Sequence, residues 1–231
     1  MDNHKYNPWP LGHIPPHLQR TELKQLEGLG YKLSDPRDAI EIFEEKVAEF
    51  AGSKYAVSVD CCSHGIFLCL KYLQATGTIT LPSQTYVSVP MQVLHAGCRV
   101  KFENLKWQGK YQLHPYPIWD SAVRWNRGMY EGGYEVLSFQ IKKRIPIGRG
   151  GMILLDDAAA YSWLKKASYD FRDLKEPYPE NTFDNLGWHY YMTPEDAARG
   201  IILMDQTPDF NADIASWENY PDLSKHSVFH E

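Results

Sequence analysis

Short apolar runs alternate with amphipathic segments between residues 39 and 102, and this alternation limits the possible folds more than any other feature of the chain. Apolar residues recur at helical spacing over residues 39–50 and stop at Gly52. β-rich runs follow at 55–59, 78–81 and 99–102, with helices predicted at 66–73 and up to His95 between them. Strands separated by helices of this length predict an α/β fold with a largely parallel sheet.

The second half of the chain continues the pattern with fewer helices. Strands are predicted to end at Asp120 and to cover residues 134–139 and 152–155, and the strand at 134–139 would deliver two lysines, Lys142 and Lys143. Residues 165–185 are rich in charge, proline and aromatic side chains and are expected to be irregular. A cap at Thr193 with proline after it predicts a final helix up to residue 204.

Composition excludes several classes of function. The 231 residues are 43% hydrophobic and 23% charged, which is enough for a sizeable core. A net charge of -5 and a pI near 6.0 give no footprint for nucleic acid or an anionic membrane. No run approaches the ~20 apolar residues that span a bilayer, so a cytoplasmic protein is expected. The four cysteines, Cys61, Cys62, Cys69 and Cys98, lack zinc-ligand spacing and are expected to be reduced thiols without a metal.

The segment from Ser138 to Gly151 gives the strongest chemical signal. Its two lysines follow an apolar strand and precede a glycine-rich turn, and Asp120 lies upstream. An amine nucleophile and an anion facing a pyridine nitrogen are what an enzyme needs to hold pyridoxal 5′-phosphate as a Schiff base. The turn at 60–65, between a strand and a helix, adds a predicted anion site, because free backbone N–H groups there attract phosphate.

The order of these segments resembles that of the DegT/StrS-type sugar aminotransferases, which belong to the aspartate-aminotransferase superfamily. The matching segments are residues 43–52, 63–65, 82–88, 93–97, 120–122, 138–143 and 186–193. The resemblance implies a three-layer αβα sandwich, the reduced large domain of a pyridoxal-phosphate transferase of fold type I. It also implies a proline-rich arm at 1–18, a cofactor-binding domain at 19–205 and a tail at 206–231, with the small C-terminal domain largely missing.

The resemblance assigns the cofactor linkage to Lys143, which would form the internal aldimine and later move the substrate proton. Lys142 is the close competitor, and only the spacing from Ser138 decides against it. Consecutive residues on a strand face opposite sides, so one of the two lysines is expected to point away. Asp120 would pair with the pyridine nitrogen and keep the ring protonated.

Other cofactor contacts are implied in the same way. Tyr86 would stack on the cofactor ring, although a plain core tyrosine is the alternative. Ser63, Ser138 and the backbone N–H of Cys62 would hold the phosphate, and Ser63 could also be a mere helix cap. His189 stands where the family has an asparagine that reaches the phosphate of a partner subunit.

The chain departs from the family near the expected site. Cys62 replaces a glycine, Arg149 replaces an acidic residue before the double glycine, and Val123 and Tyr191 replace polar residues. Residues 103–119 are also too few for the further strand and helix of the family, because a crossover with its loops needs at least ~10 to 12 residues besides the strand. The sheet is therefore expected to lack one unit.

The resemblance predicts an aminotransferase that uses pyridoxal 5′-phosphate and carries an amino group from an amino acid, with glutamate as the expected donor, to a keto sugar nucleotide. A homodimer with shared active sites is the implied assembly, and neither nucleic acid nor membrane is an expected partner. The substitutions and the short chain leave open a non-catalytic member that binds a sugar nucleotide or acts as a scaffold. Dehydration or racemisation is a third possibility, but the presence of a lysine at position 143 favours transamination.

Overall fold

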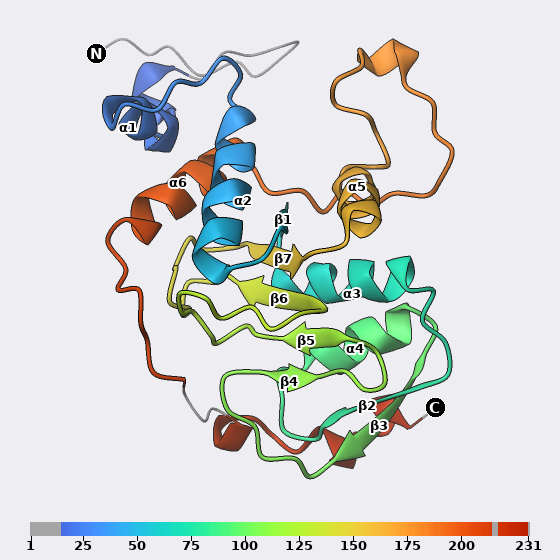
Figure 1. Ribbon diagram of the computed structural model, residues 1–231. Helices are drawn as coiled ribbons and strands as arrows, with labels where there is room; N and C mark the ends of the chain where they lie inside the picture. Colours follow the sequence, from blue (N-terminus) through green and yellow to red (C-terminus); the bar gives the residue numbers. More distant parts are fainter. Residues whose placement is uncertain (1–14, 214–216, 231) are drawn as a thin grey trace, which may run out of the picture.

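A mixed sheet lies between two layers of helices in the computed structural model, which describes residues 15–213 and 217–230 (Figure 1). The helices are α1 (Glu22–Gly28), α2 (Asp38–Ala51), α3 (Cys62–Tyr72), α4 (Ser88–His95), α5 (Ala158–Ala167) and α6 (Pro194–Met204). The strands are β1 (Tyr55–Val59), β2 (Thr78–Pro82), β3 (Arg99–Glu103), β4 (Tyr111–Gln112), β5 (Ile118–Asp120), β6 (Tyr134–Ser138) and β7 (Gly151–Leu155). Short 3₁₀ turns lie at Pro16–Leu18, Tyr178–Glu180, Trp217–Asn219, Leu223–Lys225 and Ser227–Phe229.

The strands form two hydrogen-bonded groups. The main sheet has the order β1-β7-β6-β5-β4, in which β5 and β6 are parallel and β7 and β4 run antiparallel to their neighbours. Strands β2 and β3 form a separate parallel pair. Thr80 and His114 join the two groups through an isolated antiparallel bridge. The α/β class is thus confirmed, with a sheet that is divided and more antiparallel than the sequence predicts.

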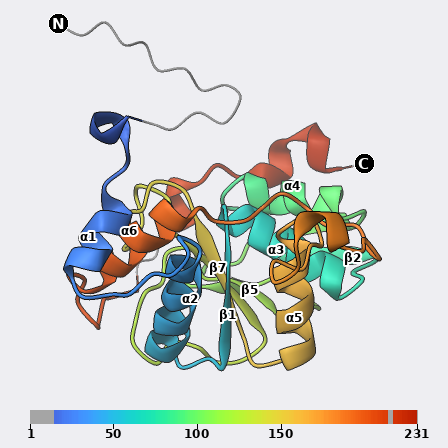
Figure 2. The same cartoon turned by 90° about the horizontal axis from the view of Figure 1, so that it is seen from above.

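Side-chain alternation along the strands creates two cores. Val57, Val136 and Ile153 point to one face of the sheet, where α3, α4 and α5 cover them. The neighbouring positions, such as Leu137 and Leu154, point to the other face, where α1, α2 and α6 pack. Figure 2 shows the strands edge-on with α2 and α6 on one side and α3 and α5 on the other. The arrangement is the three-layer sandwich that the resemblance implies.

A buried ion pair crosses the β1 edge of the sheet. Glu44 of α2 is 4% exposed and accepts hydrogen bonds from the backbone and side chain of Ser58, each at 2.7 Å. Lys165 of α5 donates to its second oxygen at 2.7 Å. Because a buried carboxylate without partners is costly, these contacts hold the two helical layers together where the sheet ends.

The sequence misses one helix, and one prediction about local structure is wrong. Helix α5 covers residues 158–167 and is capped by Asp157, whose carboxylate accepts from the backbone N–H groups of Ala159 and Ala160. Beyond α5, the segment expected to be irregular contains one 3₁₀ turn and is otherwise irregular up to residue 185. The chain leaves β6 at Ser138, and Lys142 and Lys143 lie in a turn rather than on a strand.

The other predicted elements are present within one to four residues of the expected positions. The described stretch between β3 and β5 contains the two-residue strand β4 and no helix. The expected absence of a further strand with its helix is therefore confirmed. Residues 1–14 of the expected proline-rich arm lie outside the described residues. The division of the chain at residues 18 and 205 stays a prediction. In the described ranges no helix is long and apolar enough to cross a membrane.

Candidate active site

A cavity of about 1050 Å³ opens where β5 and β6 end and α3 begins. Its lining includes most of the residues that the sequence singled out, namely Cys62, Ser63, Tyr86, Asp120, Ser138, Lys142 and Lys143. His189 is the one predicted site residue that does not line it. The cavity has the size of a small-molecule site.

Asp120 is the buried acid of the cavity, with 5% of its surface exposed. One carboxylate oxygen accepts a hydrogen bond from the Tyr111 hydroxyl at 2.6 Å, and the other accepts one from the Ala122 N–H at 3.0 Å. Burial raises the pKa of Asp120, although these two hydrogen bonds and the charge of Lys143 act in the opposite direction. The carboxylate is therefore fixed in direction and retains acceptor capacity for a further donor.

Tyr111 is a functional neighbour that the sequence did not indicate. It lies in β4, directly opposite Asp120 in the antiparallel register, and it also forms a 2.5 Å hydrogen bond with the Thr85 hydroxyl. Burial raises the pKa of Tyr111 well above its ordinary value, so its hydroxyl stays protonated. The shortened stretch between β3 and β5 thus supplies a partner for the acid.

A turn organised by Gln140 presents the two lysines. The side-chain oxygen of Gln140 accepts from the Lys142 N–H and its carbonyl accepts from the Lys143 N–H, both at 2.8 Å. Both lysines line the cavity, so the strand argument that one must point away does not hold. Lys143 is partly buried and its charge acts on Asp120, whereas Lys142 is exposed. The geometry favours Lys143 as the amine that faces the acid.

Hydroxyl groups gather at the start of α3. The helix begins at Cys62, and no side chain caps it, so backbone N–H groups of its first turn face the cavity mouth. Ser63 lies inside the helix and shares a 2.5 Å hydrogen bond with Ser88 of α4, rather than acting as a cap. Ser138 lines the same cavity from the end of β6. This arrangement of N–H and hydroxyl donors suits a phosphate.

Tyr86 is 58% exposed, which excludes the alternative of a core tyrosine. Its ring lies on the cavity wall. His189 lies elsewhere, with its side chain 68% exposed and its Nδ1 atom 2.6 Å from a carboxylate oxygen of Asp170. Its expected contact with a partner subunit stays a prediction.

A charged cluster borders the cavity beside α3. The two oxygens of Asp60 contact the Arg149 guanidinium at 2.8 Å and the His64 ring at 2.6 Å. Burial lowers the pKa of His64, but the Asp60 hydrogen bond and the neighbouring Cys61 outweigh it and raise the value to about 9. The ligand atoms of Asp60, Cys61 and His64 lie within 4.8 Å of one another, as a metal would require. Cationic Arg149 on the same carboxylate disfavours a metal cation there.

Gly151 allows the sheet to approach the α3 turn. A Cβ atom at this position would lie 2.6 Å from both the carbonyl carbon of Cys61 and the amide nitrogen of Cys62. We expect Gly151→Ala to displace the turn and to cost about 1 to 3 kcal/mol of unfolding free energy, measured by urea denaturation. Gly28→Ala is the control, because a Cβ there meets nothing within 4 Å. An unchanged α3 turn and unchanged stability in Gly151→Ala would contradict this role.

Comparison with known proteins identifies relatives by sequence and by fold. Residues 29–115 match the profile of the DegT/DnrJ/EryC1/StrS aminotransferase family. The search of curated proteins finds no match.

Solved structures with a similar fold include CalS13 from Micromonospora echinospora, which is described as a sugar aminotransferase. AtS13 from Actinomadura melliaura superposes with a TM-score of 0.67 at 18% identity, over 88% of this chain and 68% of that one. DesI, solved in the presence of its TDP-sugar product, gives 0.62 at 20% identity, over 80% and 56%. Spr1654 from Streptococcus pneumoniae, described as a putative sugar aminotransferase and solved in its PLP form, gives 0.63 at 13% identity, over 84% and 66%.

The chain spans between 56% and 68% of the length of AtS13, DesI and Spr1654. At identities of 20% or less, the structural likeness establishes the fold. The sequence match covers β1, β2 and β3 with the helices between them, which includes the α3 turn and Tyr86. The chain therefore carries the sequence pattern of the DegT/DnrJ/EryC1/StrS aminotransferase family over residues 29–115, and over most of its length it shares the fold of AtS13, DesI and Spr1654.

Proposed function

We propose that the protein is a pyridoxal-phosphate-dependent aminotransferase that acts on a keto sugar nucleotide, with glutamate as the amino donor. One observation carries the proposal: a partly buried lysine, Lys143, and a buried carboxylate, Asp120, line the same cavity at the start of α3. The relatives that share the fold include a protein solved in a PLP form and one solved with a TDP-sugar product.

The residues that line the cavity fit each chemical part of the cofactor. The first turn of α3 with Ser63 and Ser138 would hold the phosphate, Asp120 would accept from the ring nitrogen, and Tyr86 would support the ring face. Lys143 would supply the amine that reacts with the aldehyde of the cofactor. When bound, the cofactor supplies an electron sink for the carbon from which a proton is removed.

The chain's own residues would do the acid–base work. Lys143 would hold the cofactor and then, as a free amine, take the proton from the substrate carbon and return it. Asp120 would stay anionic, aided by the hydrogen bond from Tyr111, and so favour a protonated ring nitrogen. The closely spaced hydroxyls of Ser63 and Ser88 would hold the phosphate of the cofactor and so fix the position of its ring.

The substrate proposal rests on charge and on the relatives. Lys142, Arg144 and Arg149 line the cavity besides Lys143, so its wall is cationic and suits an anionic substrate such as a nucleoside diphosphate sugar. The family resemblance implies a homodimer, in which His189 of the partner subunit would complete the phosphate site. Cytoplasmic location is proposed with this function.

Borohydride trapping tests the proposal. The purified protein is incubated with pyridoxal 5′-phosphate, its visible absorbance is recorded, and borohydride then fixes any bound cofactor to its lysine. We expect a visible band before reduction and a pyridoxyl group on Lys143 in the peptide mass spectrum. A label confined to Lys142 would overturn the assignment of the lysine. Absence of both band and label would reject the enzyme and favour a non-catalytic sugar-nucleotide-binding protein.

A further inference from the structure

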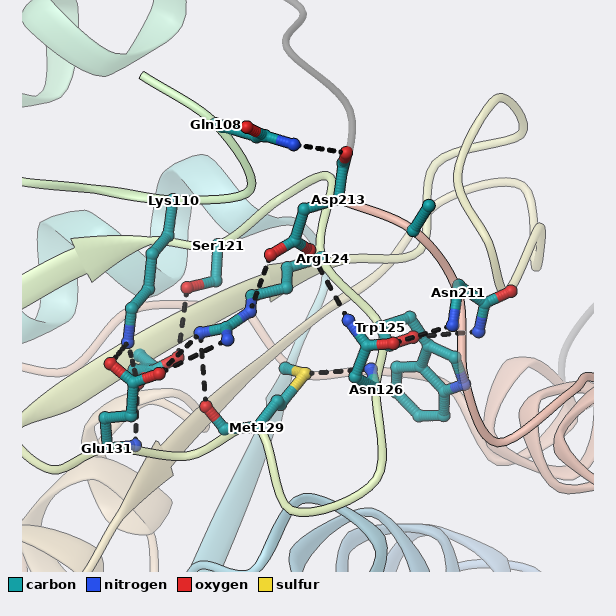
Figure 3. A network of polar contacts seen from close by, with 12 residues as sticks. Gln108, Lys110, Ser121, Arg124, Trp125, Asn126, Met129, Glu131, Asn211 and Asp213 are labelled. Carbon is teal, nitrogen blue, oxygen red and sulfur yellow. Dashed lines mark hydrogen bonds and ion pairs between the residues drawn. The ribbon is translucent and has the colours of Figure 1, made fainter.

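The segment that follows α6 is held against the cavity region by contacts on two sides of the fold. We call this segment the strap and define it as residues 205–213 and 217–230. On one side, the Asp213 carboxylate contacts Arg124 Nε at 3.3 Å and Asn126 Nδ2 at 3.4 Å, and Gln108 donates to the Asp213 carbonyl at 2.8 Å (Figure 3). Asn211 donates through its backbone N–H to the Asn126 side chain at 2.6 Å.

The second attachment joins the strap to the end of β2. The Leu223 N–H donates to the Ser83 carbonyl at 2.8 Å, and the Gln84 side chain donates to the Tyr220 carbonyl at 3.0 Å. Leu223 is buried, with 2% of its surface exposed, and Phe229 packs edge-on against Phe102 of β3. Backbone hydrogen bonds and apolar burial together fix this part of the strap.

These attachments place Tyr220 on the cavity wall. Its ring lies nearly parallel to that of Trp107, with centroids 6.2 Å apart, and meets the Tyr86 ring edge-on at 6.4 Å. The Trp107 indole donates to the Gln84 carbonyl at 2.9 Å, which ties it to the same turn. Tyr86 is otherwise an exposed ring, so Tyr220 restricts the positions that it can take.

We propose that Tyr220 is a positioning residue that holds Tyr86 in the orientation needed to support a flat ring bound in the cavity, and that the strap closes the side of the cavity on which Tyr220 lies. The identity of the flat ring as the cofactor rests on the proposed function. Asn219, next to Tyr220, also lines the cavity. The strap therefore forms part of the cavity wall in addition to supporting Tyr86.

Two measurements on Tyr220 variants test this role. The first is the dissociation constant of pyridoxal 5′-phosphate, followed by absorbance in the parent, in Tyr220→Ala and in Tyr220→Phe. We expect the alanine variant to bind about two- to tenfold more weakly, because Tyr86 loses the aromatic contact that orients it, and we expect recovery to within about twofold for the phenylalanine variant. Tyr178→Ala is the matched control, because Tyr178 is 64% exposed and does not line the cavity.

The second measurement needs no cofactor. An amine reagent labels the ligand-free protein, and peptide mass spectrometry follows the rate at Lys143. Tyr220→Ala should label several-fold faster than the parent, and Tyr178→Ala at the parent rate. If the parent fails to bind pyridoxal phosphate, the proposed function fails, and the labelling rates alone decide whether Tyr220 closes the cavity. Tyr220→Ala that labels at the parent rate, or that binds the cofactor as tightly as the parent, overturns the proposal.

Discussion

Lys143→Ala is expected to lower transamination by at least about 10³-fold, because the variant loses both the amine that holds the cofactor and the base that moves the substrate proton. Lys143 lies partly buried in the wall of the cavity that Asp120 also lines, and its charge acts on that carboxylate. The measurement is initial rate with glutamate and a keto sugar nucleotide, together with the visible spectrum. Cofactor can still bind to the variant through its phosphate and ring contacts.

Lys142→Ala is the matched control for this prediction. Lys142 has the same side chain, lies in the same turn and lines the same cavity, but it is exposed. We expect its loss to change the rate by less than about tenfold, through the cavity charge alone. The opposite ranking of the two variants would transfer the linkage to Lys142, and equal large losses would indicate that the turn itself had been disrupted.

Asp120→Asn is expected to lower the rate by about 10² to 10³-fold without weakening the fold. An asparagine keeps the shape of the side chain, can accept from the Ala122 N–H and can donate to the Tyr111 oxygen, which remains bonded to Thr85. It removes only the negative charge that favours a protonated ring nitrogen. Rate and urea denaturation are measured on the same preparation.

The stability of Asp120→Asn should depend on pH in a defined direction. The folded-state pKa of Asp120 is raised by burial, so its charge costs stability above that pKa, and the cost disappears as pH falls through it toward the unfolded value. The variant should therefore be at least as stable as the parent near neutral pH, with a difference that shrinks in acid. A variant that is less stable and fully active would show that Asp120 is structural.

Much of the fold was readable from periodicity and from turn residues. The helical spacing before Gly52 predicted α2, and the β-rich runs predicted β1, β2 and β3, because each of these patterns reflects burial on one or two faces. Helix α5 is not evident from the sequence although Asp157 caps it, since its alanine-rich start offers little amphipathic contrast. The sequence does not reveal the turn at Lys142 and Lys143 because the apolar run before it has no marked end.

The candidate site was predicted where its residues lie in recognisable segments and missed where distant segments meet. Asp120, Ser63 and Lys143 follow predicted strands or start predicted helices, and the structure places them around one cavity. Tyr111 and Tyr220 come from stretches without periodicity. Their positions depend on the pairing of β4 with β5 and on the hydrogen bonds of the strap, which are long-range contacts that no local pattern encodes.

The division between the two groups of strands has a mechanical consequence for the cavity. Asp120 and Lys143 belong to the main sheet and the turn that leaves it, whereas Tyr86 follows β2, and the two groups are joined at Thr80 and His114 by hydrogen bonds of 2.8 and 3.0 Å. In an unbroken sheet, a change in the width of the cavity would bend every strand between its walls. Here the strand ladders meet at an isolated bridge, and side-chain hydrogen bonds, Thr85 with Tyr111 and Ser63 with Ser88, also join the two walls. The width of the cavity is therefore set by a few side-chain contacts, which can change while each strand group keeps its own ladder intact.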